Sequence, residues 1–212
     1  EKMPMLIGSS ASLPQALRKT DDEQLSFSYT GSVYPTQKEA LRLIPFFRLH
    51  DSRYAIYFHQ VSEAEVESIR QEMERKERKA MELANQTADI IFPGEQQPES
   101  DHGIRYEQAK TGTDRDRHFR RAKGWFGYTL KTSKEASRLM ITTRKNDPMK
   151  VVILLNNERL TADPTISEAD QEGFVTLCYP LPQKLGAGNY PIRFSPDGTE
   201  WTPAIYEIRL LE

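Results

Sequence analysis

The sequence predicts a mainly β protein in which two antiparallel β-sandwich or jelly-roll units are joined by one long α-helix. Three observations lead to this expectation. Short apolar runs alternate with Gly, Ser, Asp and Pro over residues 1–60, a helical period begins at Ser62, and six short apolar segments follow the first hundred residues without a helical pattern between them. We therefore expect a β-sandwich portion at 1–60, a helical connector at 61–92 and a galactose-binding-like β-sandwich at 93–212.

The N-terminal segment is predicted to consist of short strands. Apolar runs occur at 3–7 and 25–29, between connections rich in turn-forming residues. Alternating apolar residues predict one strand over 41–49 and another over 54–58. The polar residues 50–53 between them are typical of a hairpin turn.

A long α-helix is predicted from about Ser62 to Ala84. Ser62 and Glu65 have the Ser-x-x-Glu spacing of a capping box. Apolar residues then recur at helical spacing, at Val66, Ile69, Met73, Ala80 and Ala84. The run 72–82 carries four acids and four bases, including i,i+4 pairs, and this balance predicts a solvated helix face.

The C-terminal half is predicted to be a second sandwich after a polar connection at 93–103, which contains two prolines and two glycines. Candidate strands lie at 124–131, 139–144, 150–155, 174–179, 190–194 and 204–211. Asn156-Asn157 and the segment 195–198 have the residue types of tight turns. Successive strands without intervening helices favour an antiparallel sandwich.

Composition limits the classes of function. The 212 residues include 29 Lys and Arg against 31 Asp and Glu, a formal charge of -2, which gives no overall field for nucleic acid. No apolar stretch reaches the roughly 20 residues needed to span a bilayer. The single cysteine, Cys178, excludes an intrachain disulfide and a multi-cysteine zinc site, and its place in an apolar segment predicts a buried thiol.

Catalytic and metal motifs are weak in this sequence. It has no Gly-x-Ser-x-Gly nucleophile motif, its four histidines are scattered, and nothing selects a glycosidase carboxylate pair, so we expect no catalytic residues. We also expect no cofactor. Glu95, Glu99, Asp101 and His102 could supply oxygen ligands to a structural calcium ion, but they lack the Asp-x-Asp-x-Asp-Gly pattern of a dedicated loop.

One segment combines bases with aromatic residues. Residues 114–123 contain several bases and two acids, and Trp125, Phe126 and Tyr128 follow. This pattern could stack on single-stranded nucleic acid, but the acids in the segment and the acidic overall balance oppose that interpretation. The alternatives are a sugar-stacking platform formed by Trp125, Tyr128 or Trp201, and aromatic side chains that simply fill a sandwich core.

Two longer stretches resemble a known family of enzymes. Residues 44–57, Ile-Pro-Phe-Phe-Arg-Leu-His-Asp-Ser-Arg-Tyr-Ala-Ile-Tyr, resemble a signature near the end of the β-L-arabinofuranosidase-like glycoside hydrolases, families 127 and 146. Residues 94–103, Gly-Glu-Gln-Gln-Pro-Glu-Ser-Asp-His-Gly, together with 118–130, resemble the galactose-binding-like module that follows in many of those proteins. Phe119, Arg121 and Gly127 depart from the pattern of that module.

The resemblance implies that this chain is a non-catalytic C-terminal accessory region. In that family a cysteine nucleophile and a cysteine- and glutamate-bound zinc lie on an upstream (α/α)6 barrel, whereas this chain has one cysteine. The implied partner is therefore that catalytic domain of the same parent chain, against which residues 1–60 would pack. The implied substrates are plant-type arabinofuranosyl glycans, and the implied location is periplasmic or extracellular.

Three functions remain open at this point. The first is an accessory region that supports the barrel and could bind oligosaccharide. The second is an autonomous carbohydrate-binding module, which requires exposed tryptophan faces. The third is a purely structural spacer in which the long helix acts as a strut. No nucleic-acid partner and no membrane span are expected under any of them.

Overall fold

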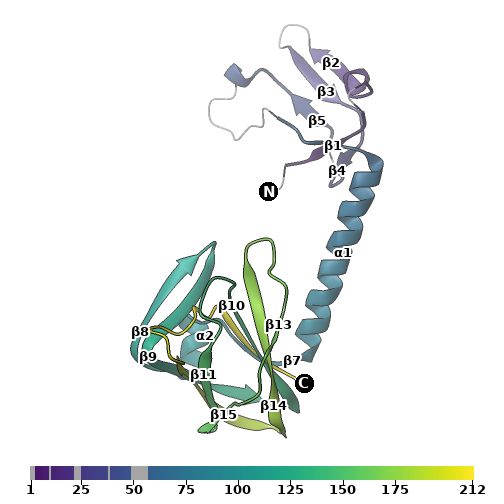
Figure 1. The fold of residues 1–212 in the computed structure, drawn as a ribbon. Helices are drawn as coiled ribbons and strands as arrows, with labels where there is room; N and C mark the ends of the chain where they lie inside the picture. Colours follow the sequence, from purple (N-terminus) through teal and green to yellow (C-terminus); the bar gives the residue numbers. More distant parts are fainter. Residues whose placement is uncertain (1–2, 10, 22–24, 38, 49–56) are drawn as a thin grey trace. The chain divides into compact units, whose positions relative to one another are not determined.

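The computed structural model confirms a mainly β protein with β-sandwich units (Figure 1). It describes residues 3–9, 11–21, 25–37, 39–48 and 57–212. The chain divides into two compact units, Glu1–Met81 and Glu82–Glu212. The long helix α1 (Glu63–Gln86) crosses the division between them.

The described residues of the first unit form two small sheets. In one, β1 (Met5–Ile7) lies between β4 (Val33–Tyr34), which is antiparallel to it, and β6 (Gln60–Val61), which is parallel to it. The other sheet is antiparallel, in the order β2-β3-β5. Its elements are β2 (Leu17–Asp21), which follows the 3-10 helix η1 (Pro14–Ala16), then β3 (Ser26–Tyr29) and β5 (Leu41–Leu43).

The strand predicted over 41–49 is shorter than expected. It ends at Leu43, and the 3-10 helix η2 (Phe46–Arg48) follows. Pro45 has no backbone N–H to donate to a sheet and restricts the residue before it, which explains why the apolar alternation does not continue as a strand. The predicted turn at 50–53 and most of the strand predicted over 54–58 lie outside the described residues.

Helix α1 confirms the predicted capping box. The Ser62 backbone N–H donates to Glu65 Oε2 at 2.7 Å, and the Glu65 N–H donates back to Ser62 Oγ at 3.2 Å. Two orphan donors of the first turn are thereby satisfied. The predicted pair between Glu72 and Lys76 forms at 3.6 Å. No residue of the helix is buried, which agrees with the solvated face predicted over 72–82.

The second unit is a sandwich of two five-stranded antiparallel sheets. One sheet has the order β13-β14-β10-β16-β7, and the other has the order β12-β11-β15-β9-β8. The first sheet consists of β13 (Thr165–Ile166), β14 (Phe174–Leu185), β10 (Ala136–Arg144), β16 (Glu207–Leu211) and β7 (Thr87–Ile91). The second consists of β12 (Glu158–Arg159), β11 (Val151–Leu155), β15 (Gly188–Pro196), β9 (Arg117–Thr132) and β8 (Arg105–Asp114).

All six strands predicted for this unit are present, and several run longer than expected. The predicted Asn156-Asn157 turn is also present, with φ values of 52° and 66° between β11 and β12. The sequence did not reveal β7, β8 or the two short strands. β8 is an edge strand whose residues are mostly exposed, so it lacks the apolar alternation that marks a half-buried strand.

The polar segment 93–103, predicted as a connection, is an ordered part of the second unit. It contains the short helix α2 (Gln96–Asp101), and the carboxylate of Glu99 within it is buried. Just before it, β7 pairs with β16 and thereby joins the first sheet. The polar composition of this segment therefore reflects hydrogen bonding to the sandwich, not separation from it.

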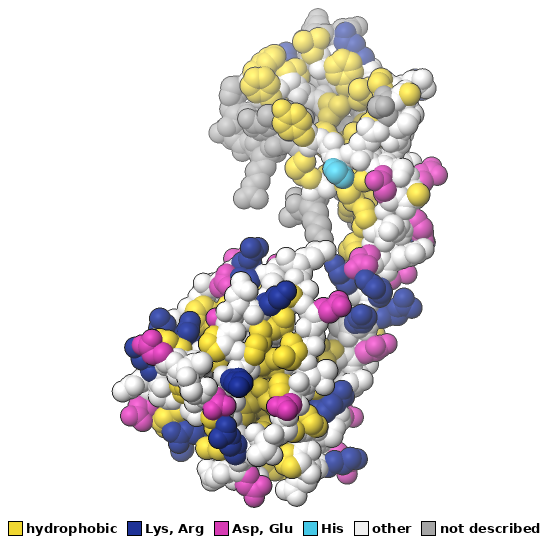
Figure 2. All heavy atoms as spheres, viewed as in Figure 1, with side chains coloured by type: hydrophobic (Ala, Val, Ile, Leu, Met, Phe, Trp, Pro, Cys, Tyr) yellow, Lys and Arg dark blue, Asp and Glu magenta, His cyan; other side chains and the backbone are white. Residues whose placement is uncertain are grey.

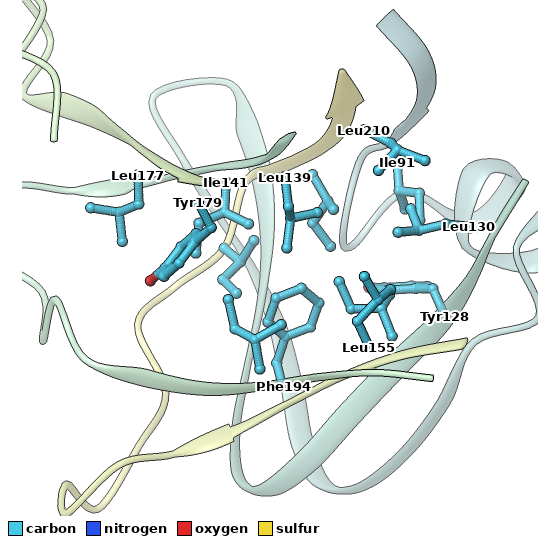
Figure 3. Close-up of a cluster of buried hydrophobic side chains, with 14 of the residues drawn as sticks. Ile91, Tyr128, Leu130, Leu139, Ile141, Leu155, Leu177, Tyr179, Phe194 and Leu210 are labelled. Atoms are coloured by element: carbon cyan, nitrogen blue, oxygen red, sulfur yellow. The ribbon is translucent and has the colours of Figure 1, made fainter. Parts of the chain in front are cut away.

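The core of the second unit lies between its two sheets. Figure 3 shows side chains of β10, β14, β7 and β16 pointing toward those of β9, β11 and β15. Phe126 and Phe194 stack there with ring centroids 5.2 Å apart, and both are fully buried. Cys178 is only half-buried, because the buried residues of β14 are its neighbours Leu177 and Tyr179. The prediction of a buried thiol is thus only partly correct.

No helix in the described part of the chain has the length and apolar character to cross a membrane.

Candidate functional site

The outer face of the β12-β11-β15-β9-β8 sheet carries one row of residues drawn from all five strands. Directly opposed residues on neighbouring strands point to the same face. In the order of the strands, from β12 to β8, the row consists of Arg159, Leu154, Arg193, Gly127 and Arg105. Because Phe126 and Tyr128 on either side of Gly127 are buried in the core, this row faces away from the core.

A hollow of about 270 Å³ lies on this row. Its floor is Gly127, which has no side chain, and Arg105 and Arg193 flank that glycine. A Cβ at Gly127 would lie 2.4 Å from the Ile192 carbonyl oxygen, so the glycine also permits the close approach of β9 and β15. Asn157, from the β11–β12 turn, also lines the hollow.

Trp125 forms one wall of the hollow. Its indole Nε1–H donates to Glu107 Oε2 at 3.1 Å, and Glu107 lies opposite it on β8. The Arg193 guanidinium carbon lies 4.0 Å from the ring centroid, a cation–π contact. The ring is half-buried, with this guanidinium on one face, so it offers less free surface than the sequence-based platform requires.

Arg105 and Arg193 are exposed, and within the described part of the chain their guanidinium groups form no hydrogen bond or ion pair. Other arginines of this unit form ion pairs with Asp or Glu. Those that contact a carboxylate are Arg117, Arg120, Arg144, Arg159 and Arg209. The hollow is therefore flanked by two guanidinium groups whose donors are free.

A buried ion pair joins α2 to β9, the strand that supplies the floor of the hollow. Glu99 of α2 accepts two hydrogen bonds from Arg120 of β9, each 2.6 Å long. It also accepts the Tyr128 hydroxyl at 2.7 Å and the Gly94 backbone N–H at 2.9 Å. Burial alone would raise the pKa of Glu99, but these hydrogen bonds outweigh it and hold the pKa below its usual range.

His102 follows α2 and directly precedes Gly103, which lines the hollow. Its Nε2 lies 3.1 Å from Asp89 Oδ1 and its Nδ1 lies 2.7 Å from the Pro98 carbonyl, so both ring nitrogens face acceptors. The Asp89 hydrogen bond raises the pKa of His102, although burial opposes it. The His102 carbonyl accepts the Thr129 N–H at 2.8 Å, which places Gly103 at the rim of the hollow.

Trp201 lies over a second part of the same sheet face. Lys110 and Arg121 oppose each other on β8 and β9, and they lie 4.5 and 5.0 Å from the Trp201 ring centroid. Lys123 lies 5.2 Å from the same centroid and also pairs with Glu200. Like Trp125, Trp201 is half-buried, with cations over its ring.

The structure therefore brings Trp125 and Trp201 to one sheet face and excludes Tyr128 from it. The Tyr128 ring is 3% exposed and packs in the core, so it cannot offer a face to a sugar. Its pKa is raised, first by burial and then by the neighbouring Glu99 carboxylate. The prediction that Tyr128 stacks on a sugar is therefore wrong, because strand alternation turns its side chain into the core.

The four residues considered for calcium do not converge on one point. Glu99 binds Arg120 inside the sandwich and His102 binds Asp89. Glu95 is exposed, and Asp101 accepts a hydrogen bond from Gln97 at 2.8 Å. Within the described residues, no group of three or more His, Cys, Asp or Glu side chains could hold a metal ion.

The basic segment 114–123 forms a hairpin between β8 and β9. Arg115 and Asp116 have φ values of 47° and 63° at its turn. Asp114 accepts a hydrogen bond from Arg144 at 2.7 Å, so part of its charge is neutralised. On the face that Figure 2 shows, basic and acidic side chains are interspersed over this unit.

Sequence reasoning missed Arg105 and Arg193, the two groups that define the hollow. Arg105 lies on a strand that was not predicted, and Arg193 lies inside the predicted strand 190–194. The alternation of Ile192 and Phe194 into the core already indicated that Arg193 faces outward. The register that places both beside Gly127 joins residues far apart in the chain, and no local pattern reveals it.

Comparison with protein families gives two matches. Residues 82–211 match the model described as "Family of unknown function (DUF6805)". The chain belongs to the DUF6805 family. Residues 1–60 match a second model, DUF4986, described as a domain of unknown function. The DUF6805 match covers the whole sandwich that carries the hollow.

No curated protein matches this DUF6805 chain. Solved structures that resemble it include a family 35 carbohydrate binding module from Clostridium thermocellum, with 13% identity and a TM-score of 0.42, covering 59% of this chain and 100% of the module. They also include the catalytic unit of a GH87 alpha-1,3-glucanase from Streptomyces thermodiastaticus, with 10% identity and a TM-score of 0.39, covering 53% of this chain and 25% of that one. The neighbours are thus carbohydrate-binding modules and glycoside hydrolase domains.

Proposed function

We propose that this chain is a non-catalytic accessory region of a glycoside hydrolase and that its second unit binds carbohydrate in the hollow on the outer sheet face. The observation that carries the proposal is the hollow itself. A tryptophan wall, two unpaired guanidinium groups and the amide of Asn157 surround a glycine floor. Aromatic rings beside hydrogen-bonding groups suit sugars, which combine apolar C–H faces with hydroxyls.

The finer assignment concerns the parent enzyme. The segments 44–57 and 94–103 resemble β-L-arabinofuranosidase-like hydrolases of families 127 and 146. We propose a parent of that type, with an upstream (α/α)6 catalytic domain, arabinofuranosyl glycans as substrates and a periplasmic or extracellular location. The chain itself is expected to hydrolyse nothing, and arabinofuranosidase turnover by the pure chain would contradict this assignment.

A titration of the full chain with plant-type oligosaccharides tests carbohydrate binding. Saturable binding should be observed by calorimetry, and Trp125→Ala should weaken it by about tenfold, since the substitution removes one wall of the hollow and the ring that orients Arg193. Tyr57→Ala serves as the matched control, because Tyr57 is an 83% exposed aromatic residue of the other unit. Absence of binding across neutral and acidic glycans would contradict the proposal.

A second function, protein contact, is favoured for the first unit. Phe46 and Phe47 are 66% and 57% exposed, and an apolar hollow of about 170 Å³ lies in the same unit. Exposed apolar surface of this kind is typical of protein interfaces. We propose that this surface contacts the catalytic domain of the parent. Phe46→Ser with Phe47→Ser should then abolish co-purification with that domain, and unchanged co-purification would contradict the contact.

A further inference from the structure

We propose that the hollow on the outer sheet face binds the carboxylate of an acidic sugar between Arg105 and Arg193. This inference rests on the proposed function and narrows it, since it assigns the ligand a negative charge. It would make the second unit a module for uronic acid residues within a glycan.

The first argument is the geometry of the row. Arg105, Gly127 and Arg193 lie directly opposite one another on three adjacent strands. With strands spaced about 4.8 Å apart, the two arginine backbones stand about 10 Å from each other across the glycine. Two guanidinium forks can therefore converge on one small anion above Gly127. Guanidinium groups match carboxylates because two N–H donors meet two oxygens.

The second argument is that both arginines lack an acidic partner in the described part of the chain, whereas five others in the same unit have one. Two nearby positive charges repel each other, and a bound anion removes that repulsion. Glu107, an acid on this face, already accepts the Trp125 indole hydrogen bond. Arg159, in the same row, is paired with Asp197 at 3.3 Å.

The third argument concerns how Arg193 is held. The Arg193 guanidinium lies over the Trp125 ring. In this cation–π contact the flat face of the guanidinium packs on the ring, and its N–H donors at the edge stay available to a ligand. Trp125 is itself fixed by Glu107 at 3.1 Å. One of the two forks is thus oriented before a ligand arrives, and this lowers the ordering cost of binding.

The size of the hollow favours a sugar residue over a polymer backbone. A volume of about 270 Å³ lies just below the roughly 300–1,000 Å³ that ligand sites span. Thr129 and Asn157 line it with neutral polar groups that suit ring hydroxyls. An acidic sugar uses all of these groups, whereas a bare anion uses only the two arginines.

The test is calorimetric titration of the full chain with a trigalacturonate and with a neutral galactan trisaccharide. We expect binding of the acidic sugar at least tenfold tighter than that of the neutral one. Arg105→Gln and Arg193→Gln should each weaken binding of the acidic sugar by about tenfold, since each removes hydrogen bonds between the guanidinium and the carboxylate. Arg115→Gln is the matched control, because Arg115 lies in the β8–β9 turn at the far end of β8.

The possible outcomes separate this inference from the proposed function. Equal binding of both sugars, unaffected by either arginine variant, would overturn the charge assignment and leave carbohydrate binding intact. Binding of acetate or sulfate as tightly as trigalacturonate would overturn the assignment to a sugar. Failure of every glycan to bind would overturn both proposals. Both arginines are exposed, so the variants are expected to fold like the original chain. Near-ultraviolet circular dichroism of each variant checks that the sandwich remains folded.

Discussion

At the scale of single residues, Glu99 and Arg120 form a buried ion pair with two hydrogen bonds in the second unit. Both side chains are buried, with residual exposures of 6% and 7%, and every oxygen of Glu99 accepts a hydrogen bond. Glu99→Gln would leave a buried guanidinium without its counter-charge. We expect it to lower the free energy of unfolding by about 3–5 kcal/mol, measured by urea denaturation.

Glu95→Gln is the matched control for this change, because Glu95 precedes the same short helix and is exposed. It should leave the unfolding free energy within about 0.5 kcal/mol of the original chain. If the two variants were equally stable, the ion pair would contribute little to the sandwich, and α2 would need another explanation for its position.

His102 makes part of this stability depend on pH. Its pKa is raised in the folded chain by Asp89, so the contribution is fully present below the unfolded value of about 6.5. The contribution is lost as pH rises through the folded pKa. Asp89→Asn should therefore destabilise the chain more at pH 6 than at pH 9. It should also return the His102 pKa, followed by proton NMR, toward 6.5, whereas a pKa unchanged by the substitution would contradict this assignment.

At the scale of elements, strand β9 explains why part of the site could be predicted from sequence. The alternation that buries Phe126, Tyr128 and Leu130 also turns Trp125 and Gly127 outward, and this follows from local order alone. The same alternation should have removed Tyr128 from the stacking residues. A strand with a clear apolar period thus specifies both of its faces.

Other elements depend on information that local order does not contain. β8 has one partner strand and exposed residues, and its bulge at Gln108, with φ of 50°, shifts its register against β9. Only that register places Arg105 beside Gly127 and Glu107 beside Trp125. Helix α1 is the opposite case, since its capping box and its charge pairs involve residues three or four apart.

At the scale of the whole molecule, the second unit is closed by its two ends. β7, at its start, pairs with β16, at its end, and the Glu212 N–H donates to the Gln86 carbonyl at 2.9 Å. Ile91 of β7 is fully buried in the core. The sequence suggested a sandwich at 93–212, because the turn-rich composition of 93–103 marks a connection, but that range omits β7.

This arrangement predicts different behaviour for two fragments. Fragment 82–212 contains β7 and should fold with the same urea midpoint as the second unit in the full chain. Fragment 93–212 loses Ile91, worth about 1.5–3 kcal/mol by burial alone, and exposes an edge of β16. It should be less stable by at least about 3 kcal/mol and should self-associate, as sedimentation would reveal.

A third fragment serves as the control for this comparison of 82–212 with 93–212. A fragment 82–212 carrying Ile91→Ala keeps the β7 backbone and loses only core volume, so its stability should lie between those of the two fragments. If 93–212 folded as stably as 82–212, β7 would be an accessory to the sandwich. The folded unit would then begin at residue 93, as the sequence predicts. The pairing of β7 with β16 would stabilise the segment 61–92 and not the core of the sandwich.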